Sequence, residues 1–299
     1  MSELFAISAA ICIAMSGMLI GELNGRVHVL RLARWQMIAA FLMTGAVSLF
    51  LGGWQSVAAW QLGYLAASSF FGIIVASTTY FATIYAIGAR NTALMFSLTA
   101  PFAVLLGYVV LGETISIQQG GGILLVLAGI ILAIGLRGRQ GEGVSSPSEG
   151  RQVPVRLPWH GIALGAITAF GQALGSLCAR PAMATGVEPF TAMAIRSGIA
   201  MVFFLMLSVL PIAALRRAPA VALKTVGIAV LAAFLGTGLG MSLLMAALAH
   251  GNVGIVSTLS SMTPVVILPM VWFRTGVCPP AQSWLGACLA VLGTALITL

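Results

Sequence analysis

Long, uncharged and strongly apolar segments follow one another along almost the whole chain, with short polar connections between them. A helix needs roughly 20 apolar residues to cross a bilayer, and ten segments approach or exceed that length. The predicted spans are residues 3–22, 34–52, 62–87, 92–111, 117–136, 159–179, 190–212, 222–248, 253–273 and 281–298. One connection, residues 137–158, is long and polar, and it separates a first five-helix unit (1–136) from a second (159–299). We therefore predict an all-α polytopic membrane protein with ten transmembrane helices.

The two units share a pattern of residues in the same order. Gly17, Gly21, Leu23 and Arg26 recur as Gly171, Gly175, Leu177 and Arg180; Gly88 and Pro101 recur as Gly251 and Pro264; Gln118, Gly122, Leu125, Gly129 and Leu132 recur as Gln282, Gly286, Leu289, Gly293 and Leu296. The offset between the copies rises only from 154 to 164 along the chain. Because each unit has an odd number of spans, the second enters the membrane upside down. Such inverted repeats bind substrate near the bilayer midplane, at the interface between the copies.

Composition excludes a soluble fold, because 60% of the residues are hydrophobic and 7% are charged, against roughly 25% charged in soluble domains. The net charge of +8 does not predict nucleic-acid binding, since the 14 basic residues are spread thinly over many loops. Twelve of them, including Arg31 and Arg34, are assigned to loops after odd-numbered spans, and only Arg180 and Arg196 to the others. By the positive-inside rule, the odd loops are cytoplasmic and both termini lie outside the inner membrane.

An enzyme is not predicted. The sequence has no aspartate, and its six glutamates all fall at span ends or in loops. No pair of carboxylates can therefore act as general acid and base within the membrane. The three histidines are far apart along the chain, which disfavours a zinc site. We expect no cofactor and no metal.

Two prolines interrupt apolar segments at equivalent places in the two units. Proline has no N–H, so Pro101 leaves the carbonyl of Ser97 without its helical partner, and Pro264 does the same to Ser260. Free carbonyls and hydroxyls in hydrocarbon are tolerated mainly where protein or water satisfies them. One alternative is a structural kink that serine repairs. The other, which we favour, is that spans 4 and 9 bend around a central cavity, with Ser257 and Ser261 also facing it.

Spans 3, 6 and 8 offer further candidates for the cavity wall. Tyr80 can stack on a substrate and donate a hydrogen bond, with Ser77 close to it along the helix. Met241 and Met245 carry flexible thioethers suited to several apolar shapes, although lipid or core contacts would explain them equally. Gln172 faces either a substrate or another helix. Without a predicted midplane cation or carboxylate, the cavity suits a neutral or zwitterionic metabolite with apolar parts, such as an amino acid.

The chain resembles the drug/metabolite transporter superfamily, and within it the ten-helix EamA branch. The resemblance rests on the two five-helix units, the arginine assigned to the start of the second span in each, the proline in the fourth, and "LGETISIQQGGGILLVLAGIIL" (111–132). The second unit departs from the pattern at Thr275 and Gly276. The EamA branch includes amino-acid exporters, some for aromatic amino acids, so the resemblance implies export. Its members commonly place both termini in the cytoplasm, whereas the charge count here, which we follow, places them outside.

These observations together predict a carrier that functions as a monomer in the lipid bilayer. Its partner is a small-molecule substrate, and it exports that substrate by facilitated alternating access, with no coupled proton. The alternative is a multidrug or other metabolite carrier of the same fold.

Overall fold

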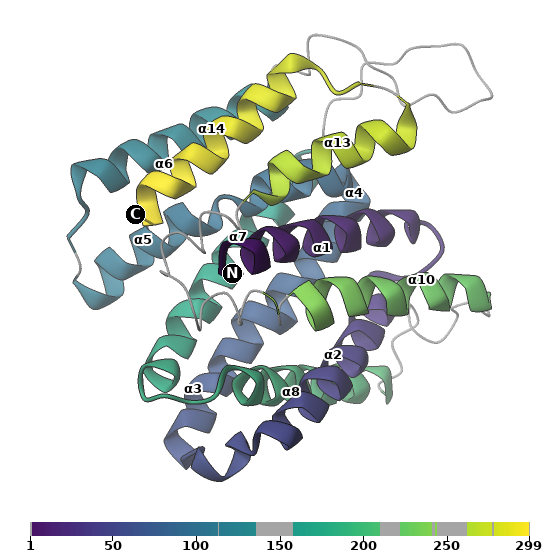
Figure 1. Ribbon diagram of the computed structural model, residues 1–299, viewed down its shortest axis with the longest axis vertical. Helices are drawn as coiled ribbons and strands as arrows, with labels where there is room; N and C mark the ends of the chain where they lie inside the picture. Colours follow the sequence, from purple (N-terminus) through teal and green to yellow (C-terminus); the bar gives the residue numbers. More distant parts are fainter. Residues whose placement is uncertain are drawn as a thin grey trace.

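The protein is described by a computed structural model that covers residues 2–112, 114–135, 158–209, 222–240, 243, 262–276 and 278–298. The regular structure in these ranges is entirely helical (Figure 1). The elements are α1 (Ser2–Glu22), α2 (Val29–Leu51), η1 (Gly53–Ser56), α3 (Ala59–Ser69), η2 (Phe70–Val75), α4 (Ala76–Phe96), α5 (Thr99–Leu111), α6 (Ile117–Ile130), η3 (Ile131–Gly135), α7 (Trp159–Ala184), α8 (Pro189–Val209), α10 (Leu223–Ala233), η5 (Phe234–Gly240), α13 (Thr263–Thr275) and α14 (Ala281–Thr298).

The predicted fold class is confirmed. Within the described ranges, seven helical runs are long and apolar enough to cross a membrane, and three shorter apolar helices accompany them. The longest run, Ala59–Phe96, contains two spans, because Gly88 adopts φ 81° and ψ 159° and reverses the chain there. A positive φ of this kind costs glycine little and other residues much more. Span 3 is thus residues 59–87, and span 4 comprises the rest of α4 together with α5.

Four arginines that were assigned to loops lie in helices. Helix α2 begins at Val29, five residues earlier than predicted, so Arg31 and Arg34 lie in its first two turns. In the second unit, Arg180 lies inside α7 and Arg196 lies well inside α8. A hydropathy profile ends a span before such residues because arginine is strongly hydrophilic. The long side chain can nevertheless belong to a membrane helix, since its apolar stem packs along the helix while the charged group reaches a polar environment.

The helix pair α6 and α14 reveals the symmetry between the units. A Cβ placed on Gly122 would lie 2.6 Å from the carbonyl oxygen of Gly293, and one on Gly129 would lie 2.5 Å from that of Gly286. Gly286 and Gly293 are themselves the counterparts of Gly122 and Gly129, at an offset of 164. The contact of Gly122 with Gly293 is therefore equivalent, under the repeat, to the contact of Gly286 with Gly129. The two helices cross antiparallel. Small residues allow this close backbone approach between membrane helices.

The units also interlock through small polar side chains. Ser48 of α2 shares a hydrogen bond with Thr191 of α8 (2.7 Å), and Ser68 of α3 donates to the carbonyl of Gly175 in α7 (2.6 Å). Each of these bonds joins the first unit to the second. In addition, π-helical turns occur at the same place in both units, as η2 and η5, whose starts are separated by 164 residues.

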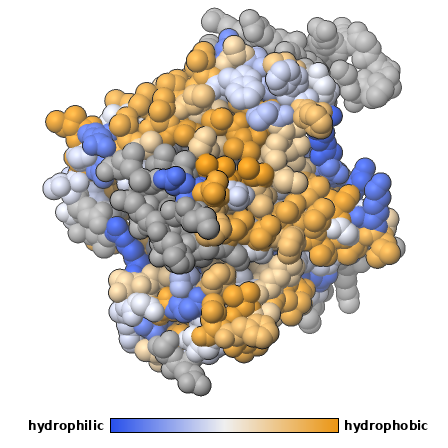
Figure 2. Space-filling model, in the orientation of Figure 1, coloured by the Kyte–Doolittle hydropathy of each residue, from blue (hydrophilic) through white to orange (hydrophobic). Residues whose placement is uncertain are grey.

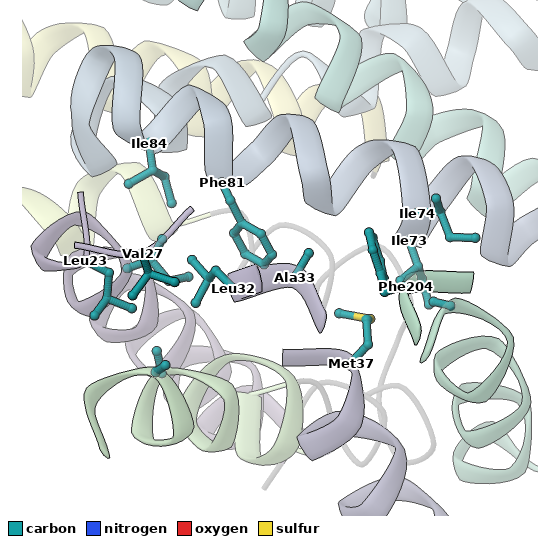
Figure 3. Close-up of a cluster of buried hydrophobic side chains, with 14 residues drawn as sticks. Leu23, Val27, Leu32, Ala33, Met37, Ile73, Ile74, Phe81, Ile84 and Phe204 are labelled. Carbon is teal, nitrogen blue, oxygen red and sulfur yellow. The ribbon is translucent and has the colours of Figure 1, made fainter. Parts of the chain in front are cut away.

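Apolar packing fills the space between helices and also covers the outside. Figure 3 shows one core cluster, in which Phe204 from the second unit lies beside Ile73 and near Met37 of the first unit. Large apolar side chains also cover much of the described surface in Figure 2, while polar residues gather where α1 ends and α10 begins. Phe50 and Phe273, for example, are 92% and 97% exposed. An exposed apolar surface of this extent fits lipid contact.

Candidate functional site

A cavity of about 370 Å³ lies between the two units. Helix α5 of the first unit forms one wall, and α7 and the end of α14 of the second unit form the others. The lining residues are Ala100, Ala103, Val104, Thr114, Ile115, Gln119, Ala173, Ser176, Leu177, Arg180, Ile297 and Thr298. Helix α5 contributes its first two turns, while α7 and α14 contribute residues near their C-terminal ends and α6 contributes its first turn. These ends of α7, α14 and α6 lie at the membrane face that carries the chain termini and the even-numbered loops (the even-loop face), so the cavity lies toward that face.

The cavity wall combines apolar and polar chemistry. Alanine, valine, leucine and isoleucine side chains form its apolar part, and three hydroxyl residues, Gln119 and Arg180 its polar part. Three of these polar residues make hydrogen bonds within the protein, and the hydroxyl of Thr298 donates to the carbonyl of Thr294 (3.0 Å). Ser176 donates to the carbonyl of Gln172 (3.0 Å), and the amide oxygen of Gln119 accepts from the backbone N–H of Ser116 (3.0 Å). The sequence predicted an uncharged cavity, but Arg180 lines this one.

Span 4 is interrupted close to Pro101, as predicted, and the interruption lies next to this cavity. Helix α4 ends at Phe96 and α5 begins at Thr99, with Pro101 in its first turn. Between them, Ser97 and Leu98 make i→i−3 hydrogen bonds of 3.1 Å each, and the Thr99 hydroxyl donates to the carbonyl of Phe96 (2.7 Å). The interruption is therefore a tight 3₁₀-like turn.

The second unit repeats the helix that follows this turn. Helix α13 is 13 residues long, as α5 is, and carries Pro264 in its first turn. The two helices end at Gly112 (φ 67°) and Gly276 (φ 70°), which are 164 residues apart. Gly276 thus takes the place of Gly112, although the adjoining sequence departs from the family pattern.

The predicted site residues of spans 3, 4 and 6 lie near the cavity or the break in span 4, but none of them lines the cavity. Pro101 and Gln172 do not line the cavity, but their neighbours Ala100 and Ala173 do. The Tyr80 ring makes an edge contact with Phe96, with ring centroids 5.9 Å apart, which places it beside the break in span 4. Within the described residues, the following side chains have no hydrogen-bond partner: Ser77, Tyr80, Ser97 and Gln172.

Of the other predicted site residues, one is described by the structure and five are not. Pro264 is described, and it is buried in the first turn of α13. Met241, Met245, Ser257, Ser260 and Ser261 lie outside the described residues. It therefore stays a prediction that spans 8 and 9 form part of the wall of a central cavity.

An ion pair joins the units at the opposite membrane face, which carries the odd-numbered loops (the odd-loop face). Glu22 ends α1, Arg274 lies in the last turn of α13, and their side chains are in direct contact. The pair is partly shielded, with 27% of Glu22 and 46% of Arg274 exposed. Beneath it, Ala14 of α1, Ala93 of α4 and Ile267 of α13 pack together. The odd-loop face is therefore closed between α1 and α13.

Sequence reasoning missed Arg180 and Arg196. A signal for the first was available, because Gln172, Ser176 and Arg180 are spaced i, i+4, i+8 and share one face of α7. Arg196 was placed at the opening of span 7, whereas it is the eighth residue of α8, with its Nε buried and unpartnered. The expectation of no basic residue deep in the membrane is wrong.

Comparison with known proteins agrees with this architecture. A solved crystal structure superposes on the chain with a TM-score of 0.67 at 19% sequence identity, covering 99% of this chain and 96% of that one. At this identity the likeness concerns the fold alone. A search of the curated proteins found no match. The model of the EamA-like transporter family matches residues 1–135 and 159–299, nearly the whole chain, and the chain therefore belongs to the EamA-like transporter family.

Proposed function

We propose that the protein, a membrane transporter of the drug/metabolite superfamily, exports small zwitterionic or neutral metabolites, and in particular amino acids with aromatic or other apolar side chains. The observation that supports this best is the cavity between the two units, beside the break in span 4. Inverted-repeat transporters bind their substrates at this interface. The protein acts as a monomer in the inner membrane, with both termini outside.

The size and lining of the cavity support a substrate of this kind. Its volume of about 370 Å³ falls at the small end of ligand pockets, which span roughly 300–1,000 Å³. The apolar wall of α5 suits a hydrocarbon or aromatic group. Arg180 on α7 adds a positive charge to the cavity. A hydrophobic cation, the substrate of a multidrug carrier, would be repelled by Arg180.

The two membrane faces differ in a way that fits alternating access. The cavity lies toward the even-loop face, and the contact between α1 and α13 closes the odd-loop face. If the two units rock about the α6–α14 crossing, the cavity closes on one side and α1 separates from α13 on the other. The π-turns η2 and η5 interrupt the α-helical pattern at equivalent places in both units, and such turns are frequent at functional sites.

Counterflow in liposomes tests the proposal. Vesicles containing the purified protein are loaded with an unlabelled amino acid, and uptake of labelled amino acids is measured with no pH gradient. We expect phenylalanine, leucine and similar amino acids to exchange, because no described residue offers a membrane-embedded carboxylate to carry a proton. A hydrophobic cation such as tetraphenylphosphonium should not exchange.

Two outcomes would contradict the proposal. Uptake that depends strictly on a pH gradient would exclude the uncoupled mechanism. Exchange of hydrophobic cations, with none of the amino acids, would identify the multidrug carrier that the sequence leaves open.

A further inference from the structure

Arg196 is a charged side chain inside a membrane-spanning helix. It is the eighth residue of α8, and its backbone carbonyl accepts a hydrogen bond from Ser69, the eleventh residue of α3 (2.6 Å). At 1.5 Å per residue, these positions lie roughly 10–15 Å along their helices from the even-loop face. Half of the hydrocarbon core is about 15 Å. The backbone of Arg196 therefore lies within the hydrocarbon core, on the even-loop side of its middle.

The guanidinium extends further toward the bilayer centre. Helices α3 and α8 run in the same direction, because Gln61 near the start of α3 bonds to Thr185 just before α8, and Ser69 at the end of α3 bonds to Arg196 inside α8. Gly72 lies one turn deeper than Ser69, and Nη2 of Arg196 would be 3.0 Å from a Cβ placed on Gly72. A basic side chain that only minimises its cost turns toward the headgroups. This one turns the other way, onto the π-turn η2.

No carboxylate faces this guanidinium in the described part of the chain. Its contact there is from Nη1 to the sulfur of Met193 (3.5 Å), and Nε is buried with no acceptor. The carboxylate of Glu188, at the start of the same helix, accepts from the backbone of Phe190 and Thr191 instead. Glu22 is paired with Arg274. An unpaired charge at this depth is costly and marks functional sites in membrane proteins.

We propose that Arg196 binds an anionic group of the transported molecule, a carboxylate, on the face of α8 that meets the π-turn η2. The inference rests on the proposed function and narrows it, because the substrate then has to carry a negative charge and cannot be a neutral metabolite. A lipid headgroup does not reach the site, since the guanidinium points away from the membrane surface. The residue as a whole is partly accessible, not fully buried.

The test compares a carboxylate substrate with its amide. Labelled L-phenylalanine and L-phenylalaninamide are presented to wild type, Arg196→Met and Arg196→Lys in liposomes. Losing a charge-assisted hydrogen bond should raise KM for phenylalanine about 10- to 100-fold in Arg196→Met, with KM for the amide unchanged. Arg196→Lys should recover part of the loss. Lys224→Gln, which neutralises an exposed basic residue at the start of α10, should leave both values unchanged.

A merely structural arginine would give a different result. Arg196→Met would then slow both substrates equally through a lower maximal rate, and that outcome would overturn the proposal. Gel filtration and circular dichroism show whether each variant is folded. If Arg196→Met does not fold, the comparison is made with Arg196→Lys, for which the proposal requires the KM of phenylalanine, and not that of the amide, to rise.

A binding measurement separates this inference from the proposed function. Benzoate should raise the melting temperature of the purified wild type, benzamide should not, and Arg196→Met should respond to neither. If wild type exchanges no amino acid but is stabilised by benzoate through Arg196, the amino-acid substrate is wrong and the carboxylate site stands. If amino acids exchange while benzoate stabilises wild type and Arg196→Met equally, the carboxylate site is wrong and the proposed function stands.

Discussion

Cross-linking α1 to α13 is expected to stop transport completely. With Glu22 and Arg274 both replaced by cysteine, in a protein whose four native cysteines are replaced by serine, a short cleavable bifunctional thiol reagent should join the two helices. A bifunctional reagent is used because a direct disulfide requires Cα atoms within roughly 7 Å of each other. The joined helices could not separate, so the odd-loop face would stay closed. Counterflow before and after cross-linking measures the effect.

The controls for this experiment separate the cross-link from the substitutions. Losing a half-exposed ion pair costs only about 0–1 kcal/mol, so the uncross-linked double variant should still transport. Each single-cysteine variant treated with the reagent should transport as well, and cleaving the linker should restore the double variant. Full transport by a protein shown to be cross-linked would mean that α1 and α13 do not separate during the cycle.

Filling the cavity should have an equally large effect. Ala103 lines the cavity from α5, and an indole at this position would occupy the space that α5 shares with α7. In Ala103→Trp we expect amino-acid exchange to fall to the level of protein-free vesicles, because the substrate and the side chain cannot share the same volume. The measurement is initial exchange rate per folded protein.

The same helix offers a matched control. Val109 is 69% exposed on α5 and does not line the cavity, so Val109→Trp adds the same side chain on an open surface. It should exchange amino acids at the wild-type rate. Wild-type exchange by folded Ala103→Trp would show that the cavity between α5 and α7 is not on the transport route.

The fold was largely predictable because its main determinants are local. Apolar length located the spans, and the missing N–H of Pro101 located the break in span 4. The shared spacing of Gly122 and Gly129 with their counterparts indicated the repeat before the α6–α14 contact was seen. Even the tight reversal between spans 3 and 4 had a local signal in Gly88, which alone can adopt its backbone angles cheaply.

The site was less predictable because its residues come together only through packing. Ala103, Ser176 and Thr298 lie far apart in the sequence and meet because α5 packs on α7 near the end of α14. The depth of Arg196 depends on α8 starting at Pro189 and on its register with Ser69, and hydropathy reports neither. Predicting an uncharged cavity followed from treating every arginine as a loop residue, which the helix boundaries contradict.

Thiol labelling of the cavity tests the central claim most directly: that a substrate site lies between the two inverted units and opens to one membrane face at a time. Ser176 lines the cavity from α7, and Ser176→Cys in the cysteine-free protein gives one reporter there. A membrane-impermeant maleimide should label it from the even-loop face, and phenylalanine should slow the labelling. Cross-linking α1 to α13 should leave it open to that face alone. Labelling that no substrate slows, or that proceeds equally from both faces in the cross-linked protein, would contradict the account.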